Sequence, residues 1–252
     1  MTLSGTAATE ERREMLRAIL REDGTVDLAA ASEKLDVHPM TVRRDLDFLE
    51  REGIARRVRG GAVYVGVEDF HQRQGRHFAA KRRIAEKLVP LIKSNQAIGF
   101  DASTTVFQLA SALKDVEQLS VITNGLATFT ALQHRPGIRA YLTGGESEEQ
   151  NASLVGPLAV ASLSSFLLNT CFLSTTCIDP FIGTSEPTMA QVEVKKAMAD
   201  ASQFVVVATD STKLGTRSVA RALPMARIDL LVTELDPKDP KLDPFRDVTD
   251  IL

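Results

Sequence analysis

The chain has 252 residues, a formal net charge of -3 at pH 7 and a sequence pI of about 5.9. Hydrophobic residues make up 44% of the chain and charged residues 25%, which excludes a disordered protein, and no apolar run approaches the ~18 residues that a membrane-spanning helix needs. The negative balance excludes a uniformly basic nucleic-acid coat, so any contact with DNA must come from a local cluster of positive charge.

The first 65 residues begin with the pattern of two helices. Thr9 is expected to cap a first helix that ends at Gly24, because glycine readily adopts the left-handed conformation after a helix. Asp27 is expected to cap a short second helix that ends near Leu35. A tight turn, with the sequence VHPMTV, follows it.

A third helix is expected from Pro39 to about residue 52, and it has two unlike faces. On a helical wheel, Val42, Leu46 and Leu49 fall within one arc and predict the face that packs on the first two helices. The opposite face and its edge carry Met40, Arg43, Arg44, Asp47 and Arg51. That face is expected to meet a molecule outside the protein.

The stretch IARRVRGGAVYV, after Gly53, predicts two short strands with a hairpin turn at Gly60 and Gly61. Three helices followed by a hairpin form a winged helix-turn-helix, whose third helix fits the major groove of DNA. The wing carries Arg56, Arg57 and Arg59, which can reach phosphates or the minor groove.

Charge along the third helix and wing leaves an alternative open. Residues 43 to 60 hold six arginines and four acidic residues, a surplus of only two positive charges. The arginines could therefore belong to a solvated face with pairs four residues apart. If they do bind DNA, specificity should depend on base contacts and dimerisation more than on bulk charge.

Residues 66–80, GVEDFHQRQGRHFAA, have no sustained hydrophobic period. We interpret them as a linker between a DNA-binding domain at residues 1–65 and a second domain at residues 81–252. His71 and His77 lack acidic or cysteine partners at ligand spacing, so neither is expected to bind a metal.

The second domain shows apolar runs of strand length separated by stretches long enough for helical crossovers. These runs are residues 97–101, 119–124, 138–143, 170–175, 204–210 and 229–234. Their apolarity is continuous rather than alternating, which indicates strands covered on both faces. The sequence therefore predicts a mostly parallel α/β sheet.

Polar residues gather after these runs, where ligands bind in parallel sheets. They are Ser103, Thr104 and Thr105 before a helix, then Thr123, Asn124, Gly144, Gly145, Asp210, Ser211 and Lys213. Hydroxyls at a helix N-terminus, amides and one lysine suit a phosphorylated sugar or small polyol. Neither a P-loop nor a G-x-G-x-x-G motif is present, so nucleotide cofactors are disfavoured and we expect no cofactor.

Both parts resemble one known family. The stretch TVRRDLDFLEREGIARRVRGGA resembles the helix-turn-helix of DeoR-family regulators, and FDASTT, VITNG, LTGGE, EVKKAM and TDSTKLG follow the order of that family's C-terminal sensor domain. The sensor fold is similar to that of sugar-phosphate isomerases such as ribose-5-phosphate isomerase. The residues expected to contact DNA are Met40, Thr41, Arg43, Arg44, Asp47, Arg51, Arg56, Arg57 and Arg59. The resemblance implies phosphate contacts from Ser103, Thr104 and Thr105, and effector contacts from Asp101, Thr123, Asn124, Gly144, Gly145, Asp179, Glu193 and Lys213.

An enzyme is the main alternative, because the implied fold is that of an isomerase. A winged helix has no role in isomerisation, however, so we expect a transcriptional regulator without catalytic residues, a repressor of carbohydrate metabolism genes controlled by a phosphorylated sugar. Its expected partners are double-stranded operator DNA, the effector and further copies of itself, with no membrane contact. Two cysteines and an amino terminus without a signal-peptide core favour the cytoplasm.

Overall fold

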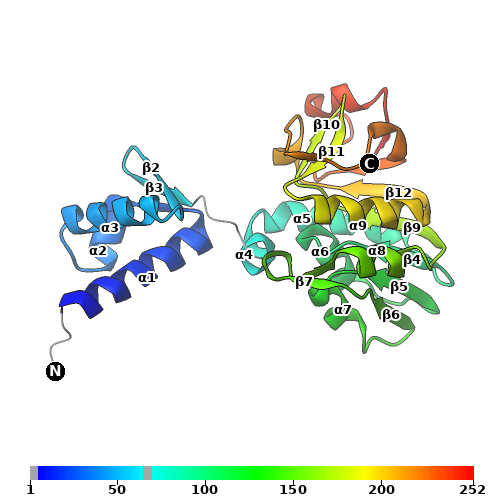
Figure 1. Cartoon of the computed structure of the whole chain (residues 1–252). Coiled ribbons are helices and arrows are strands. Elements are labelled where there is room, and N and C mark those ends of the chain that lie inside the picture. Colours follow the sequence, from blue (N-terminus) through cyan, green and yellow to red (C-terminus); the bar gives the residue numbers. More distant parts are fainter. Residues whose placement is uncertain (1–4, 65–69) are drawn as a thin grey trace. The chain divides into compact units, whose positions relative to one another are not determined.

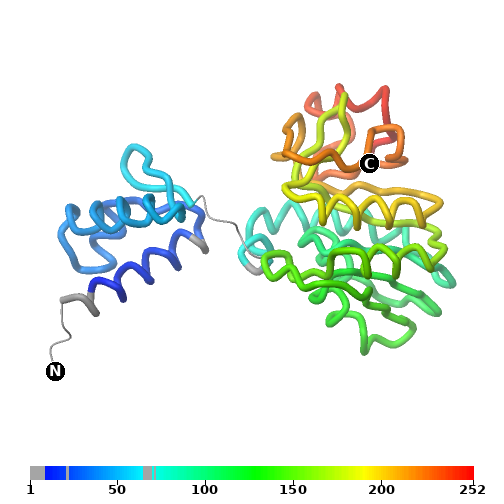
Figure 2. The backbone as a smooth tube through the Cα atoms, viewed as in Figure 1, coloured from blue at the N-terminus to red at the C-terminus, as the bar shows by residue number. Residues whose placement is uncertain are grey.

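A computed structural model describes residues 5–64 and 70–252 of the chain (Figure 1). The backbone separates into two compact units, residues 1–68 and residues 69–252 (Figure 2). Each unit has its own hydrophobic core. The part of the predicted linker at residues 66–69 lies outside the described residues.

The first unit contains three helices and a three-stranded antiparallel sheet with the order β1-β3-β2. The elements are α1 (Gly5–Asp23), β1 (Thr25–Asp27), α2 (Leu28–Lys34), α3 (Pro39–Arg51), β2 (Ala55–Val58) and β3 (Gly61–Tyr64). The predicted inner face of α3 is confirmed, because Val42, Leu46 and Leu49 are fully buried against α1 residues such as Leu16 and Leu20.

Helix α1 differs from its prediction at the amino end. It begins at Gly5, so Thr9 lies inside the helix and does not cap it. Residues 5–8 are Gly-Thr-Ala-Ala, and alanine is the strongest helix former, so the helix extends past the expected cap. The other helix signals are confirmed: the Asp27 carboxylate accepts hydrogen bonds from the N–H groups of Ala29 and Ala30, and Pro39 is the first residue of α3.

The wing also differs in detail. Val58 pairs with Gly61, so the turn consists of Arg59 and Gly60, and Gly61 belongs to β3. A Cβ on Gly61 would lie 1.9 Å from the carbonyl oxygen of Val26, which explains why a second glycine is needed. Strand β1 was not predicted, because its three residues form a strand only by pairing with β3.

Asp45 connects two helices of this unit. The residue is 2% exposed, and its two carboxylate oxygens lie 2.6 Å from Nε of Arg12 and 3.0 Å from Nε of Arg13. The Arg13 guanidinium also lies over the Phe48 ring at 3.7 Å. The acidic residue of the RRDL motif therefore holds α1 on α3, so it does not weaken the positive charge on the outer face.

The second unit is built on a seven-stranded sheet with the order β15-β14-β12-β9-β4-β5-β6, in which every neighbouring pair is parallel. The strands are β4 (Ala97–Phe100), β5 (Leu119–Thr123), β6 (Ile138–Leu142), β9 (Leu168–Leu173), β12 (Ser202–Ala208), β14 (Leu230–Val232) and β15 (Asp250–Ile251). The prediction of a parallel sheet is confirmed. Strand β15 was missed, because it has only two residues.

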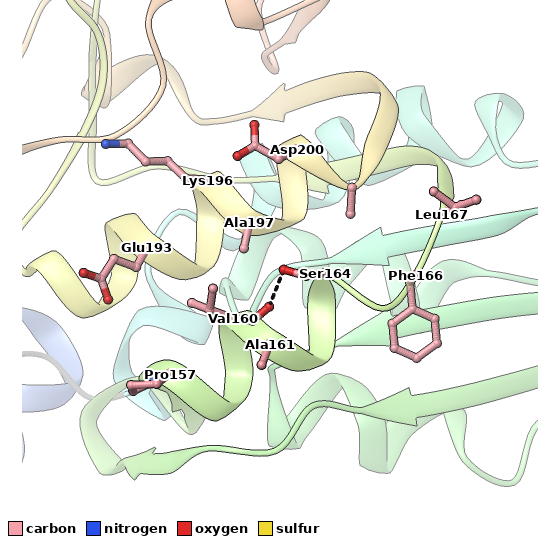
Figure 3. Close-up of a pocket in the computed structure, with 11 residues that line it drawn as sticks. Pro157, Val160, Ala161, Ser164, Phe166, Leu167, Glu193, Lys196, Ala197 and Asp200 are labelled. Atoms are coloured by element: carbon pink, nitrogen blue, oxygen red, sulfur yellow. Dashed lines mark hydrogen bonds between the residues drawn. The ribbon is translucent and has the colours of Figure 1, made fainter.

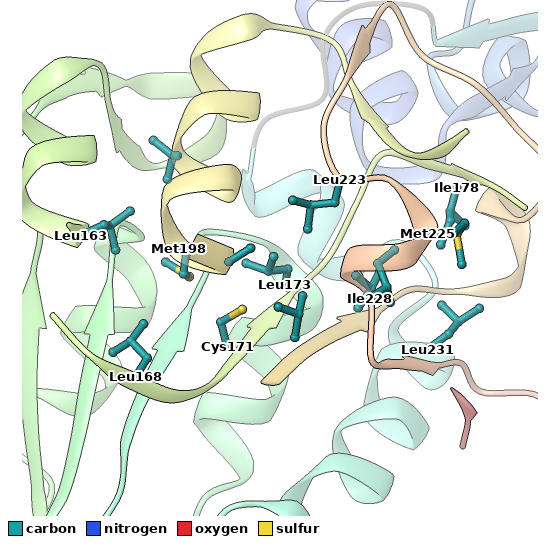
Figure 4. Packing of buried hydrophobic residues seen from close by; sticks show 14 of the residues in the cluster. Leu163, Leu168, Cys171, Leu173, Ile178, Met198, Leu223, Met225, Ile228 and Leu231 are labelled. Carbon is teal, nitrogen blue, oxygen red and sulfur yellow. The ribbon is translucent and has the colours of Figure 1, made fainter. Parts of the chain in front are cut away.

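Helices cover both faces of this sheet. One face packs on α5 (Phe78–Leu88), α6 (Thr104–Ala112) and α7 (Leu126–Leu132), and the other packs on α8 (Pro157–Leu163) and α9 (Met189–Asp200). Figure 4 shows the core between the sheet and the helices α8 and α9, in which Leu163, Met198 and Cys171 pack together. Continuous apolarity was therefore interpreted correctly for the central strands, whereas the edge strand β6 is only half-buried.

Two smaller sheets were not predicted. One is antiparallel and contains β10 (Cys177–Asp179), β11 (Gly183–Glu186) and β13 (Ala220–Arg221). The other pairs β7 (Glu146–Glu148) with β8 (Ser153–Val155). Short 3-10 helices complete the unit: η1 (Val89–Leu91), η2 (Glu149–Asn151), η3 (Ser211–Lys213), η4 (Met225–Arg227) and η5 (Pro240–Phe245).

The interpretation of residues 66–80 as a linker is wrong from Phe70 onward. Residues Phe70–Gly75 form helix α4, and α5 begins at Phe78. Phe70 is 3% exposed and its ring meets that of Phe107 edge to face, with centroids 5.5 Å apart. A six-residue helix with one buried aromatic is too short to produce a hydrophobic period, so sequence periodicity could not detect it. Among the described residues, no helix is long and apolar enough to span a membrane.

Candidate functional site

The outer face of α3 presents arginines away from the core of the first unit. Arg43 and Arg44 are exposed, and within the described residues neither has an ion pair or a side-chain hydrogen bond. Met40 is 49% exposed beside them, and Thr41 is half-buried. On the wing, Arg56 and Arg59 are likewise exposed. These positions suit contact with an external polyanion.

Other predicted DNA contacts are engaged within the unit. Arg57 is half-buried, and its side-chain Nε lies 3.2 Å from the Asp47 carboxylate. Its backbone N–H donates to the Glu50 carboxylate at 2.7 Å. Arg51 is exposed, but its Nε donates to the Asp47 carbonyl at 3.3 Å and its guanidinium lies 5.8 Å from the centroid of the Phe48 ring. Arg57 and Asp47 thus hold the wing against α3, which the charge pattern alone did not reveal.

In the second unit, a row of buried polar residues directly follows the strands of the parallel sheet. Each member is the first residue after its strand, and all are at most 5% exposed. In sheet order the row is Thr233, Thr209, Ser174, Asp101, Asn124 and Thr143. Because parallel strands end at one edge, these side chains gather where α/β sheets bind ligands.

Asp101 organises the centre of this row. One of its carboxylate oxygens accepts from the N–H of Ser103 at 3.0 Å, and the other accepts from the N–H of Ser174 at 2.8 Å. Nζ of Lys195 lies 3.7 Å from the same carboxylate and donates to the Ser174 carbonyl at 2.6 Å. Lys195 also forms an ion pair with Glu186 at 2.6 Å, so α9 and β11 contribute charges to the strand-end row.

Lys213 brings a second ammonium group to this edge. Its Nζ donates to the Thr175 carbonyl at 2.9 Å and lies 3.7 Å from the Asp210 carboxylate. Burial lowers the pKa of Lys213 below its ordinary value, attraction by Asp210 opposes this, and repulsion by Lys195 adds to it. Burial alone would raise the pKa of Asp210, but the charge of Lys213 and the hydrogen bonds from Thr212, with smaller contributions, together outweigh burial, and the net shift is downward.

Several oxygens of the row have no hydrogen-bond partner among the described residues. These buried atoms include Oγ of Ser174, Oγ1 of Thr209, Oδ1 of Asn124 and Oγ1 of Thr143. A buried polar atom without a partner costs free energy, and such atoms are rare in native proteins. Four of them lie at strand ends of the same sheet, so this edge holds hydrogen-bonding capacity that no described residue uses.

The predicted Ser/Thr loop lies at the amino end of α6. Ser103 caps the helix, because its Oγ accepts from the N–H of Val106 at 3.1 Å, which leaves its hydroxyl hydrogen available to an anion. Thr104 and Thr105 are 6% and 1% exposed and lie in the first turn. Thr123 is fully buried, and its Oγ1 accepts from the N–H of Gly125 at 3.0 Å, so its role is mainly to shape the loop.

The glycine pair after β6 also shapes the backbone. The N–H of Gly144 donates to Oγ of Ser162 at 3.2 Å. Gly145 has φ +134°, and a Cβ there would lie 2.5 Å from the carbonyl oxygen of Val155. The close approach of the Val155 carbonyl therefore requires glycine at position 145. The sequence analysis expected Gly145 to contact the effector and did not predict this packing requirement.

Two residues implied by the family resemblance lie apart from the strand-end row. Asp179, on β10, pairs with Arg217 at 2.7 Å, and the hydrogen bond from this guanidinium lowers the pKa of Asp179. Glu193 is exposed on α9 and lines a groove of about 690 Å³ between α8 and α9 (Figure 3). Lys195 lies two residues further along the helix, on its opposite side. The structure thus brings together Asp101, Ser103, Asn124 and Lys213, but not Glu193.

Sequence reasoning missed Lys195, Glu186, Ser174 and Thr209. Ser174 and Thr209 end apolar runs that were recognised, so the rule about strand ends could have identified them. Lys195 and Glu186 reach the edge only through tertiary packing. No group of three or more metal-ligating side chains occurs within residues 5–64 and 70–252.

These features define a class of protein: a DNA-binding regulator in which a winged helix-turn-helix is joined to an α/β ligand-binding unit. Residues 12–66 match the model of the DeoR-like helix-turn-helix domain, and residues 76–235 match that of the DeoR C terminal sensor domain. The chain belongs to the DeoR family of transcriptional regulators. The expected family is thereby confirmed.

Relatives match along most of the chain. The HTH-type transcriptional regulator GolR of Listeria innocua serovar 6a is 32% identical over 228 residues, which cover 89% of this chain and 90% of that protein. The glycerol-3-phosphate regulon repressor of Escherichia coli K12 is 26% identical over 230 residues, which cover 90% and 91% of the two chains. Among solved structures, ribose 5-phosphate isomerase A from Neisseria gonorrhoeae is similar with a TM-score of 0.36 and 19% identity, over 54% of this chain and 53% of that one.

Proposed function

We propose that this regulator represses genes of carbohydrate metabolism and releases its operator when a phosphorylated sugar, or a related small anion, binds the sensor unit. The observation that supports this most directly is the row of buried polar residues after neighbouring strands, with Lys213 and Lys195 beside it. Ammonium groups attract an anion, and the hydroxyl and amide groups can bind the hydroxyls of a sugar.

In this proposal the phosphate lies at the amino end of α6. The hydroxyl of Ser103 can donate to it, and the free N–H groups and dipole of the helix favour negative charge. Lys213 supplies a compensating positive charge, while the Asp210 carboxylate can accept hydrogen bonds from sugar hydroxyls. The mixture of cation and carboxylate favours a phosphate ester with hydroxyl groups over inorganic phosphate.

We further propose that the site binds its ligand without turning it over. Isomerisation of a sugar phosphate needs a carboxylate that is free to take a proton from carbon. Glu186 is engaged by Lys195 and by the hydroxyl of Thr176 at 2.8 Å, and Asp101 accepts from two backbone N–H groups. These contacts occupy oxygens of both carboxylates, which favours a sensor over an isomerase.

On the DNA side, we propose that the exposed face of α3 enters the major groove and that Arg56 and Arg59 of the wing contact the backbone or minor groove. The protein acts as a homo-oligomer, so that two winged helix-turn-helix units bind two half-sites of the operator. A regulator of operator DNA works in the cytoplasm, where we place it.

The proposal is tested by a thermal-shift screen of the full chain. The panel contains ribose 5-phosphate, glucose 6-phosphate, fructose 6-phosphate, tagatose 6-phosphate and glycerol 3-phosphate, with the free sugars, glycerol and inorganic phosphate as controls. A ligand at 100 times its Kd should stabilise the fold by about 2.7 kcal/mol through mass action. We expect at least one phosphate ester to raise the melting temperature more than its free sugar does.

A compound that raises the melting temperature is then added to a gel-shift titration with promoter DNA from upstream of the regulator's own gene. It should weaken binding of the protein to this DNA. Stabilisation without any change in DNA affinity would contradict the regulatory role. Conversion of the compound, followed by NMR, would support an isomerase instead. Lack of a response to every phosphate ester would exclude the proposed class of effector.

A further inference from the structure

Helix α4 packs directly on the helix that begins at the proposed phosphate position. The edge-to-face contact between Phe70 and Phe107 joins α4 to α6. The N–H of Phe107 donates to the carbonyl of Ser103 at 2.9 Å, so this contact involves the first turn of α6. In Figure 1, α4 accordingly lies beside α6 within the sensor unit. A movement of α4 would therefore displace the amino end of α6.

A buried lysine fixes the other end of α4. Lys81 is 4% exposed, and its ammonium group donates to the carbonyls of Arg73 and Arg76, the second at 2.6 Å. These carbonyls lie at the carboxyl end of α4, where a cation also interacts well with the helix dipole. His77, with φ +53°, makes the sharp turn into α5. Helix α4 is thus a docked part of the sensor unit.

Arg73 extends from α4 towards η2. It is half-buried, and its Nη2 lies 3.5 Å from the carbonyl oxygen of Gln150 in η2. That short helix leads into β8, whose Leu154 carbonyl accepts from the Asn124 amide at 3.1 Å. Arg73 therefore lies between the α6 side and the β7–β8 side of the candidate site. Its charge also adds to the lowering of the pKa of Lys213, after the larger effect of burial, so the two cations are close enough to repel each other.

We propose that Arg73 is an effector-binding residue and that α4 carries effector occupancy to the DNA-binding unit. The inference rests on the proposed function, because it assigns an additional contact to the same anion site. A guanidinium binds phosphate through two parallel hydrogen bonds, which a lysine cannot reproduce. Strand β3 ends at Tyr64 and α4 begins at Phe70, so α4 is the first sensor element after the connection. An anion that draws Arg73 inwards pulls on this element.

The test compares Arg73→Gln with Arg83→Gln, a matched control on α5 that removes the same charge from an exposed side chain. Both full-length variants are titrated by calorimetry with each phosphate ester of the panel that stabilises the wild type. We expect Arg73→Gln to bind at least tenfold more weakly and Arg83→Gln to match the wild type. Arg73→Lys should recover part of the loss, because it keeps the charge but not the planar fork.

The second readout is the ratio of operator affinities with and without the same ester at saturating concentration. Phe70→Leu loosens the α4–α6 contact and keeps Arg73, so this ratio should fall towards one while the ester still binds. Unchanged ester affinity in Arg73→Gln, or an unchanged ratio in Phe70→Leu, would overturn the inference and leave the proposed function intact. If no ester stabilises the wild type, both are rejected. Circular dichroism confirms that each variant is folded.

Discussion

At the scale of single residues, the arginines of the first unit divide into two groups that the sequence does not distinguish. Arg44 is exposed and forms no ion pair within the described residues, whereas Arg57 is held by Asp47 on the neighbouring helix. An arginine whose guanidinium is paired with a carboxylate has less to offer a phosphate or a base. Sequence pattern identifies the residue types, and only the structure shows which are available.

We predict that Arg44→Ala weakens binding to a specific operator by ~1–3 kcal/mol, the usual size of a lost base contact. Arg57→Ala should instead reduce the stability of the wing, since it breaks the contact with Asp47. Fluorescence anisotropy at a fixed salt concentration measures the first effect, and hydrogen exchange of the amides of β2 and β3 measures the second. Equal loss of operator affinity in both variants would argue against this division.

Lys213 should give effector binding a dependence on pH. Its pKa in the folded protein lies below the ordinary value of about 10.4, chiefly because of burial. A phosphate ester is fully ionised above its second pKa of about 6, so only the lysine changes charge at higher pH. Protonated Lys213 attracts the anion, and affinity is lost as pH rises through the lowered pKa.

The measurement is calorimetry from pH 7 to 10 with a phosphate ester that stabilises the wild type. Affinity should fall across this range and at a lower pH than an ordinary lysine would give. Lys213→Arg keeps its charge throughout, so its affinity should stay level. A wild-type profile as flat as that of the arginine variant would show that Lys213 does not contact the anion.

At the scale of elements, the wing depends on a close approach of backbones that only glycine allows. A Cβ on Gly61 would lie 1.9 Å from the Val26 carbonyl oxygen, so β1 and β3 could not keep their present pairing. We predict that Gly61→Ala destabilises the wing sheet by ~1–3 kcal/mol, as overpacking does elsewhere. Gly75→Ala is the matched control, because nothing lies within 4 Å of a Cβ at that position.

Hydrogen exchange of the β1 and β3 amides reports the loss of pairing in Gly61→Ala, and operator binding should weaken with it because the wing carries Arg59 in its turn. If these amides were protected from hydrogen exchange as well as in the wild type, the backbone would accommodate the added Cβ without loss of stability. Helix α4 likewise depends on a contact that is distant in sequence. A six-residue helix with one buried aromatic residue has no periodic signal, and α4 is held in the sensor unit by the contact with Phe107, which lies far along the chain.

At the scale of the whole molecule, regulation requires that the effector binds two states of the protein unequally. A coupling free energy of ~1–3 kcal/mol would change operator occupancy about 5- to 150-fold. A homo-oligomer with two winged helix-turn-helix units should recognise two half-sites whose centres lie about 34–36 Å apart or at a multiple of that distance.

We therefore predict that inserting half a helical turn, 5 base pairs, between the half-sites weakens binding more than inserting a full turn of 10 does. Gel shifts with such operators measure the effect, and sedimentation velocity gives the oligomeric state of the full chain at the same concentrations. A monomer in solution and on DNA, with no dependence on spacing, would contradict the proposed assembly.

The sequence by itself determined the elements whose signals are local. The two faces of α3, the cap at Asp27, the start of α3 at Pro39 and the apolar runs of the central strands follow from neighbours along the chain, and so does the position of polar residues after those strands. Tertiary structure decided which of these residues meet. The sheet order places β9 between β12 and β4, although these strands are not consecutive along the chain, and this brings Asp101 to Ser174 and to Lys195. Such pairs depend on long-range packing between separate elements, which no local pattern of residues encodes.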